Sequence, residues 1–186
     1  MSVIETTTEL APAGTWSADP VHSNVSFEVG YAGVNTFRGG FREFSVSLTG
    51  GSEPALEGSA KVASIDVKDE NLNGHLQSPE FFDTARFPEI TFRATELHGV
   101  GGDAVEGAGE LTIKGVTRPI AIKGTIASAP VTDPFGRERL GLSLETTIDR
   151  TQYGVSWNAP NQTGGGNYLA DDVTLVAELA LVKQEA

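Results

Sequence analysis

The chain has 186 residues, the usual length of one domain, and no cysteine, which excludes disulfides, thiolate metal sites and a cysteine nucleophile. Its formal net charge of −12 repels phosphate backbones and anionic membrane surfaces at long range, so nucleic acid is not an expected partner. Residues 1–13 lack the charged and apolar segments of a signal peptide, and no later stretch is apolar enough to span a bilayer. We therefore expect a cytoplasmic protein without stable membrane insertion, in which residues 1–13 form a disordered or weakly ordered leader.

Alternation of apolar and polar residues with a period of two predicts β-strands from Asn24 onward. Residues 25–29 form the first clear run. Within residues 37–48 the apolar parity changes, which requires an extra residue, so we expect a β-bulge near Arg42–Glu43. The parity changes again within residues 56–67. Two long, bent strands of this kind are typical of sheets that close into barrels.

One long segment, around residues 69–84, interrupts the alternation and is predicted to be a helical insertion. Leu72 and Leu76 are four residues apart and share one helix face, and Asp69 suits the positive N-terminal end. Ser78 is followed by a proline, which is the pattern of a second helix start.

The same segment brings three aromatic rings, Phe81, Phe82 and Phe87, into seven residues. This is too much apolar surface for an exposed connection, so other parts of the chain must cover it. The rings either plug one end of a barrel or line the entrance to a cavity. Both interpretations hold if the plug is also a gate.

Further alternating runs follow the insertion, separated by turn signals, and a long loop covers residues 151–169. The runs lie at residues 90–94, 105–113, 120–126, 140–148 and 173–181. The chain is therefore predicted to be all-β, an extended up-and-down antiparallel β-barrel of about eight strands. Closure removes the exposed edges that an open sheet of this size would leave. Residues 14–184 show no internal repeat and form a single domain.

Small residues occupy the apolar faces of several predicted strands, where a packed core would have Leu or Ile. A single glycine of this kind can ease coiling at a barrel corner. As a set, the small residues favour an elongated apolar cavity. They are Gly39, Gly58, Ala60, Ala94, Gly107, Gly109, Gly124 and Ala177.

Several motifs follow one another in order from about Thr15 to Lys183. They are Asp19-Pro20-Val21-His22-Ser23, Phe41 after Gly39-Gly40, His75-Leu76-Gln77-Ser78 before Phe81-Phe82-Asp83, Phe87-Pro88, the segment from Gly109 to Pro119, and Ile148-Asp149-Arg150 with Tyr153-Gly154. In these motifs the chain resembles the YceI-like family. The resemblance implies a lipocalin-like barrel that binds polyisoprenoid lipids or isoprenoid quinones in its lumen, without enzymatic activity.

The chain departs from that family at two places. Many members begin with a signal peptide and look periplasmic, and such a segment is not found here. The family usually carries an Arg-Asp pair before the position of His75, where this chain has Leu72-Asn73-Gly74.

We hypothesise that the protein holds an isoprenoid lipid for transport, storage or stress response. The residues expected to contact the lipid are Phe27, Phe37, Phe41, Phe81, Phe82, Phe92 and Trp157. A pyrophosphate head group needs cations at the mouth, and the candidates are Arg38, Arg42, Arg86, Arg93 and Arg150, each equally suited to a solvated surface. A neutral head group such as a quinone needs fewer charges. Asp19, His22 and His75 are expected to be structural, with the histidines anchoring a strand and the helical segment.

We expect no catalysis, no bound metal and no cofactor. His22, His75 and His98 show no metal-ligand spacing, and no serine lies in a Gly-x-Ser-x-Gly elbow. The alternative is a stress-related structural or partner-binding protein with a filled barrel, and a histidine-dependent metalloenzyme is less favoured. The length of the lipid, its head group and the oligomeric state, including a homodimer, stay open.

Overall fold

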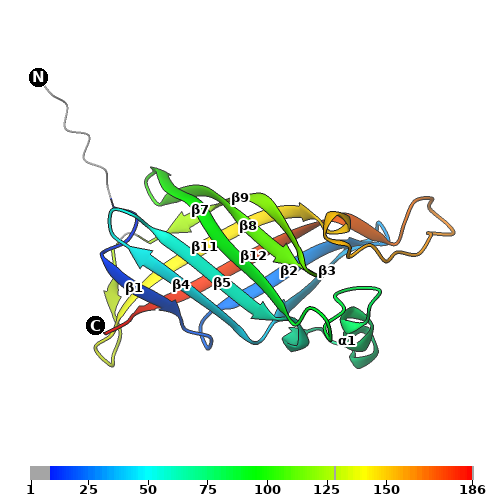
Figure 1. Cartoon of the computed structure of the whole chain (residues 1–186), viewed down its shortest axis with the longest axis horizontal. Helices are drawn as coiled ribbons and strands as arrows, with labels where there is room; N and C mark the ends of the chain where they lie inside the picture. Colours follow the sequence, from blue (N-terminus) through cyan, green and yellow to red (C-terminus); the bar gives the residue numbers. More distant parts are fainter. Residues whose placement is uncertain (1–8, 128, 186) are drawn as a thin grey trace, which may run out of the picture.

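The structure is a computed structural model that describes residues 9–127 and 129–185. Within these residues it contains twelve strands, one α-helix and two 3₁₀ turns (Figure 1). The strands are β1 (Gly14–Ala18), β2 (Asn24–Tyr31), β3 (Asn35–Phe41), β4 (Phe44–Gly50), β5 (Ala55–Lys61), β6 (Ile65–Asp66), β7 (Glu89–Gly101), β8 (Ala104–Ile113), β9 (Val116–Ile126), β10 (Val131–Thr132), β11 (Glu138–Asp149) and β12 (Leu169–Lys183). The helix is α1 (Glu70–Gln77), and the 3₁₀ turns are η1 (Val62–Ser64) and η2 (Arg150–Tyr153).

Eight of the strands close into an antiparallel barrel, which confirms the predicted fold class. They are neighbours in the order β11, β9, β8, β7, β5, β4, β1 and β12. The ring closes where β12 returns to β11, and this pairing runs from Arg139↔Val182 to Asp149↔Asp172. Closure leaves no long free edge around the ring, which is the physical advantage expected from the sequence.

The short strands β2, β3 and β6 extend the barrel at the end that carries α1. β12 pairs with β1 near Leu181 and with β2 from Val173 to Glu178, so β2 continues the course of β1. β3 pairs with β2 as β4 pairs with β1, so β3 continues the course of β4. The wall at this end is therefore continuous across interrupted strands.

The β-bulge expected near Arg42–Glu43 is a complete break between β3 and β4. The chain is also interrupted at residues 19–23, between β1 and β2, and at η1, between β5 and β6. Backbone hydrogen bonds from Arg42 N to Ser64 O (3.0 Å) and from Lys61 N to Glu43 O (2.9 Å) hold the broken ends together. The parity change was correctly located, but it marks the end of one strand and the start of the next.

The end of the barrel away from α1 is filled by packed side chains. Trp16, Leu48 and Leu181 are fully buried there, among aliphatic residues of every neighbouring strand. Leu10 and Ala11 are also buried in this cluster, and the Trp16 indole donates to the carbonyl of Pro12 at 3.0 Å. The expected leader thus falls partly on residues 1–8, outside the described residues, and partly on a segment that packs against the barrel.

The predicted helix forms at α1, and Asp69 caps it by accepting a hydrogen bond from Leu72 N at 2.8 Å. The second helix expected at Ser78 does not form. Ser78 instead caps the end of α1, since its Oγ donates to the carbonyl of His75 at 2.6 Å. The turns that follow bond back to α1, with Phe82 N donating to Leu76 O and Thr84 N to Gln77 O. The last carbonyls of α1 are satisfied in this way, without a further helix.

Across the described residues, no helix has the length and apolar character required to cross a membrane.

Candidate functional site

A cavity of about 560 Å³ lies inside the half of the barrel nearest α1. Its wall is almost entirely apolar and is built by residues of β2, β3, β4, β5, β7, β8, β9, β11 and β12. Leu56, Ile122, Leu144 and Leu179 belong both to this lining and to the packed core at the closed end. The packed half of the barrel therefore forms the floor of the cavity, and α1 lies at its mouth (Figure 1).

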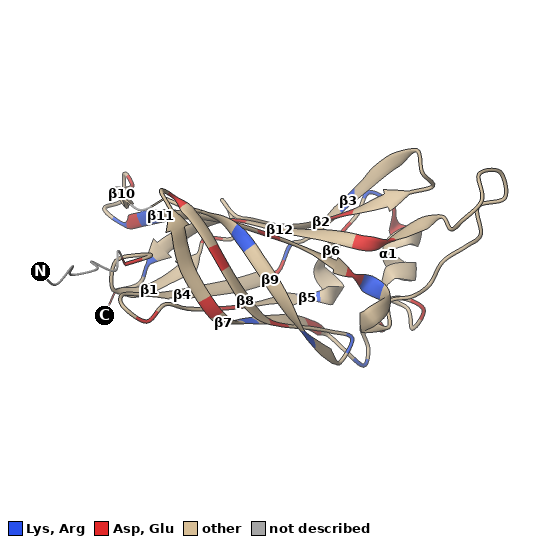
Figure 2. Cartoon of the chain, turned by 90° about the horizontal axis from the view of Figure 1, so that it is seen from above, with Lys and Arg blue, Asp and Glu red and all other residues tan. Residues whose placement is uncertain are grey.

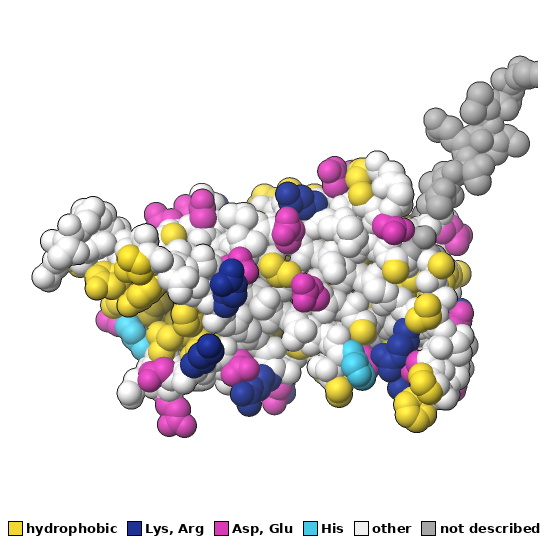
Figure 3. All heavy atoms as spheres, turned by 180° about the vertical axis from the view of Figure 1, so that it is seen from behind, with side chains coloured by type: hydrophobic (Ala, Val, Ile, Leu, Met, Phe, Trp, Pro, Cys, Tyr) yellow, Lys and Arg dark blue, Asp and Glu magenta, His cyan; other side chains and the backbone are white. Residues whose placement is uncertain are grey.

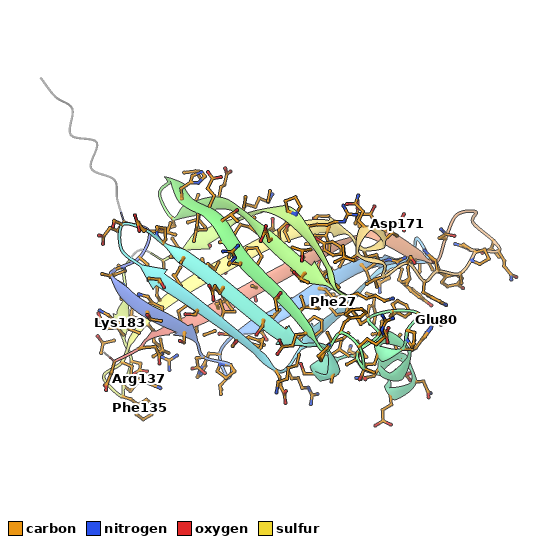
Figure 4. All side chains as sticks on the ribbon, viewed as in Figure 1. Phe27, Glu80, Phe135, Arg137, Asp171 and Lys183 are labelled. Carbon is orange, nitrogen blue, oxygen red and sulfur yellow. The ribbon has the colours of Figure 1, made fainter. Side chains whose placement is uncertain are left out.

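All seven predicted lipid-contacting residues line this cavity: Phe27, Phe37, Phe41, Phe81, Phe82, Phe92 and Trp157. Phe27, labelled in Figure 4, lies inside the barrel with ring centroids 6.1 Å from both Phe37 and Phe41. Phe41 contacts Phe82 at 6.4 Å, and Phe81 contacts Trp157 at 5.4 Å. The rings thus line the cavity from the barrel wall to the segments that cover its mouth.

His75 joins the two segments that cover the mouth. Its ring lies 4.9 Å from Phe81 on its own side and 4.9 Å from Trp157 on the long loop after β11, both edge-to-face. Its Nε2 lies 2.6 Å from Oε2 of Glu80. The segment of α1 and the following turns therefore both covers the mouth and lines the cavity, because Leu72, Leu76 and Phe81 all face it.

The small residues expected to leave space have three different roles. Gly58, Ala60 and Ala177 line the cavity. Gly39 and Gly109 lie beneath aromatic rings, since a Cβ on either would come within 2.5 Å of Phe27 or Phe92. Gly107 and Gly124 allow close approach of a neighbouring strand, as a Cβ there would meet a backbone oxygen at 2.2 and 1.8 Å.

Arg150 is the one head-group candidate among the residues that line the cavity. It is buried, and it holds the mouth loop in place: Nε donates to Ala170 O (2.9 Å), and Nη1 donates to Val155 O (2.7 Å) and Trp157 O (2.9 Å). Burial lowers the pKa of this guanidinium, opposed by the charges of Asp171 and Asp149. Nη2 is buried without a hydrogen-bond partner, and the nearest carboxylate oxygen, on Asp171, is 3.8 Å away.

Tyr153 supplies a second polar group at the cavity, and it was missed from the sequence. It is 2% exposed and lines the cavity, and its hydroxyl has no hydrogen-bond partner. Burial raises the pKa of this phenol. A buried hydroxyl usually finds a partner, so an unpaired one beside a cavity requires an explanation. The signal available in the sequence was the spacing from Arg150, which places both residues in one 3₁₀ turn, η2.

The other four arginines are not among the residues that line the cavity. Each is more than 60% exposed and pairs with an acidic residue: Arg38 with Glu28 (2.8 Å), Arg42 with Asp66 (3.0 Å), Arg86 with Asp83 (3.5 Å) and Arg93 with Glu110 (3.4 Å). Arg38, for example, lies between two residues that face inward, so strand geometry turns it outward. Among the described residues that line the cavity, Arg150 is therefore the one arginine or lysine.

Asp19 and His22 lie at the closed end of the barrel, away from the cavity. His22 Nδ1 is 2.7 Å from Asp19 Oδ2, and Arg139 donates to the same carboxylate at 2.9 Å. Arg139 also donates to Asp133, at 2.8 Å, and the hydrogen bonds lower the pKa of both carboxyl groups. This network joins the segment between β1 and β2 to the loop before β11.

No group of three or more His, Asp or Glu side chains is placed to hold a metal ion in the described ranges. The site is thus an apolar cavity with one buried cation and one buried hydroxyl.

The chain is similar to known proteins in sequence and in fold. Residues 16–181 match the family model of the YceI-like domain. Among known sequences, a UPF0312 protein of Staphylococcus epidermidis is 30% identical over 151 residues, which cover 79% of this chain and 85% of that protein. A UPF0312 protein of Pseudomonas putida is 28% identical over 141 residues, covering 72% and 71% of the two chains.

Solved structures share the fold. Burkholderia cenocepacia BcnA superposes with a TM-score of 0.76 at 22% identity, covering 90% of this chain and 99% of that one. A polyisoprenoid binding domain from Saccharophagus degradans superposes with a TM-score of 0.69 at 15% identity, covering 91% and 98%.

Proposed function

Because the chain belongs to the YceI-like domain family, we propose that it is a non-catalytic binding protein that holds an isoprenoid lipid in its barrel cavity. The observation that carries the proposal is the apolar cavity of about 560 Å³, within the size range of small-molecule sites. The polyisoprenoid binding domain from Saccharophagus degradans, which shares the fold, supports the same ligand class. Binding of an isoprenoid lipid would serve transport, storage or a role in stress response.

Burial of the prenyl chain provides ample binding energy, at about 0.8 kcal/mol for each methylene removed from water. However, a prenyl lipid otherwise lies in a membrane, so the net driving force is the small difference between two apolar environments. Selectivity must then come from the length of the cavity and from the head group.

Arg150 and Tyr153 are the groups that we propose contact the head group. Both residues line the cavity, and each carries a buried donor without a hydrogen-bond partner, Nη2 and the hydroxyl respectively. A ligand oxygen would satisfy either donor and recover the cost of its burial. A pyrophosphate needs several cations, and Arg150 alone suits a neutral oxygen better, such as a quinone carbonyl or a prenol hydroxyl.

The filled-barrel alternative, a partner-binding protein without a ligand, is less well supported because a cavity of this size would be left empty. Organic extraction of the purified protein followed by mass spectrometry distinguishes the two. We expect an isoprenoid lipid in the extract, or uptake of a prenyl alcohol by the extracted protein. An extract without lipid, combined with no uptake, would contradict the proposal.

A cavity-filling variant tests the location of the ligand. A Cβ at Gly58 would make ordinary contacts, 3.5 Å from Ser45 O and from Val46 Cγ2, so Gly58→Leu can fold and place its side chain in the cavity. We expect uptake of geranylgeraniol, followed by fluorescence, to fall about tenfold or more, since the added side chain occupies space that prenyl methylenes would fill.

The matched control is Gly99→Leu. Gly99 is an exposed strand glycine on β7, and a Cβ there approaches only Ala104 O, at 3.9 Å. Its uptake should equal that of the natural protein. Equal losses in both variants, or full uptake by Gly58→Leu, would place the ligand elsewhere.

A further inference from the structure

Two segments at the mouth of the barrel carry no charge. Residues 29–37, around the turn between β2 and β3, and residues 151–170, the long loop before β12, contain no Asp, Glu, Lys or Arg, although these types make up 20% of the chain. We call these two segments the uncharged rim. Figure 2 shows both as the loops that project beyond the barrel, with charged residues beginning behind them.

The two segments of the uncharged rim lie side by side. Leu169 pairs with Tyr31 across the strands, and Ala32 N donates to Tyr168 O at 2.6 Å. The rings of Tyr31 and Tyr168 meet edge-to-face at 5.7 Å. The rim is therefore one continuous surface, although its halves are far apart in the sequence.

The rim also presents apolar side chains to solvent. Val34 is 79% exposed, Tyr31 45% and Tyr168 38%. Both tyrosines line the cavity as well, so the apolar lining of the site continues onto the outer surface. Figure 3 shows hydrophobic side chains gathered at this end of the molecule, beside the projecting loop.

We propose that the uncharged rim docks on the surface of a lipid bilayer. The inference rests on the proposed function, because a prenyl ligand resides in membranes and its transfer through water would expose its apolar chain. Tyrosine is enriched at membrane interfaces, where its ring is in an apolar layer and its hydroxyl is hydrated. A segment without charges can enter this layer without the cost of desolvating an ion.

The charge of the rest of the molecule favours the same orientation. The net charge of −12 lies outside the rim, so an anionic bilayer repels the rest of the molecule as a whole. The opposite side of the mouth carries Glu70 and Glu80, both exposed, on α1 and the turn after it. Contact therefore occurs on the β2–β3 side of the mouth, where the lining reaches the surface.

A second copy of the chain suits the rim less well. A stable protein interface buries about 800 Å² on each partner, with a well-packed apolar centre. The rim exposes three large apolar side chains, and most of its other exposed residues are polar or glycine.

The experiment compares two variants with the same substitution at equally exposed valines. Val34→Asp adds a charge to the rim at a residue that does not line the cavity, and Val21→Asp adds the same charge at the closed end, where Val21 is 82% exposed. Binding of each full-length protein to vesicles of pure phosphatidylcholine is measured by flotation. We expect Val34→Asp to lower vesicle binding about tenfold and Val21→Asp to leave it unchanged.

Gln162→Glu, a second rim substitution at an exposed position, should act in the same direction as Val34→Asp. Addition of phosphatidylglycerol to the vesicles should weaken binding of the natural protein at low salt, and added salt should restore it. Uptake of geranylgeraniol from detergent micelles, measured in parallel, should be equal in all these proteins.

Absence of prenyl uptake in every protein would reject the proposed function itself. Normal uptake without binding of the natural protein to any vesicle would overturn the docking proposal alone. Equal loss of vesicle binding in Val34→Asp and Val21→Asp would also overturn it. Self-association of the natural protein that Val34→Asp abolishes, measured by sedimentation, would assign the rim to a second copy instead.

Discussion

Arg150 and Tyr153 are three positions apart in η2, and the fold uses their polar atoms differently. Nε and Nη1 of Arg150 donate hydrogen bonds to three carbonyls and so fix the loop that covers the mouth. The Tyr153 hydroxyl has no hydrogen-bond partner, and the side chain is buried beside the cavity. Arg150 therefore holds the mouth loop and keeps one unpaired donor, Nη2, whereas the Tyr153 hydroxyl makes no hydrogen bond at all.

Removal of the Tyr153 hydroxyl separates its role in stability from its role in binding. A buried hydroxyl without a partner costs about 1–3 kcal/mol, so Tyr153→Phe should leave the free energy of unfolding unchanged or raise it. The same variant should bind a prenol about fivefold more weakly, the value of one hydrogen bond, and a prenyl hydrocarbon of equal length without change. Urea denaturation and fluorescence titration measure the two effects.

Thr95→Val is the control, because it removes an exposed hydroxyl on β7 from a residue that does not line the cavity. Its affinity for both ligands should match that of the natural protein. An equal loss of prenol and hydrocarbon binding in Tyr153→Phe would show that the ring, and not the hydroxyl, sets affinity.

At the scale of elements, the two ends of the barrel are held by different forces. Ring contacts among α1, the following turn and the long loop cover the mouth. At the closed end, Arg139 lies between Asp19 and Asp133 and joins the β1–β2 segment to the β10–β11 hairpin. Arg137 adds a further contact to Asp133 at 3.0 Å and lies near the exposed Phe135 (Figure 4).

Acid should weaken this closed end. Hydrogen bonds to Arg137 and Arg139 lower the pKa of Asp133 below its value of about 3.9 in an unfolded chain. A carboxyl group with a lowered native pKa stabilises the fold above the unfolded pKa and loses that contribution as the pH falls. The melting temperature of the natural protein should therefore fall more steeply between about pH 5 and pH 2 than that of Asp133→Asn.

Asp133→Asn should also be less stable at neutral pH, since it removes a charged acceptor from two arginines. Asp172→Asn, an exposed position on β12, serves as the control and should keep the pH dependence of the natural protein. Equal pH dependence in Asp133→Asn and the natural protein would exclude Asp133 as a source of acid sensitivity.

At the scale of the whole molecule, the barrel consists of a packed half and a hollow half. The packed half contains the fully buried Trp16, Leu48 and Leu181, and the hollow half contains the cavity and its cover. A hollow apolar interior loses dispersion contacts that a packed one makes, so a bound ligand would complete the core of the second half.

Ligand binding should therefore raise the stability of the whole barrel. At a prenol concentration of about 100 times Kd, binding to the native state adds about 2.7 kcal/mol, which corresponds to a rise of roughly 5–10 °C in Tm for a chain of this size. Scanning fluorimetry of the extracted protein measures this shift. The Gly58→Leu variant should show little or none, and an unchanged Tm in the natural protein at saturation would contradict binding inside the barrel.

Strand periodicity allowed much of the barrel to be predicted. Phe27, Phe37, Phe41 and Phe92 face the cavity because they lie on the apolar parity of their strands. The same rule of alternation should also have excluded arginines that lie between two inward-facing residues from the head-group candidates. Arg93 lies between Phe92 and Ala94, so its strand turns it outward, where it pairs with Glu110.

The small residues were expected to leave space inside the barrel, but only Gly58, Ala60 and Ala177 line the cavity. Gly39 and Gly58 have the same inward parity, yet a ring covers one and the cavity borders the other. Which of these occurs depends on the rotamers of residues on neighbouring strands, and no pattern within one strand specifies them.

The sequence by itself determined the all-β class, the helical insertion with its cap at Asp69, and the aromatic residues of the wall, because alternation and capping are properties of neighbouring residues. The tertiary structure decided that one half of the barrel is packed and the other hollow, and that Arg150 and Tyr153 face the cavity. These two residues lie beyond the end of β11, where the period of two no longer applies. Their positions are set by hydrogen bonds and packing to loop residues on either side, and those contacts exist only once the chain has closed around the cavity.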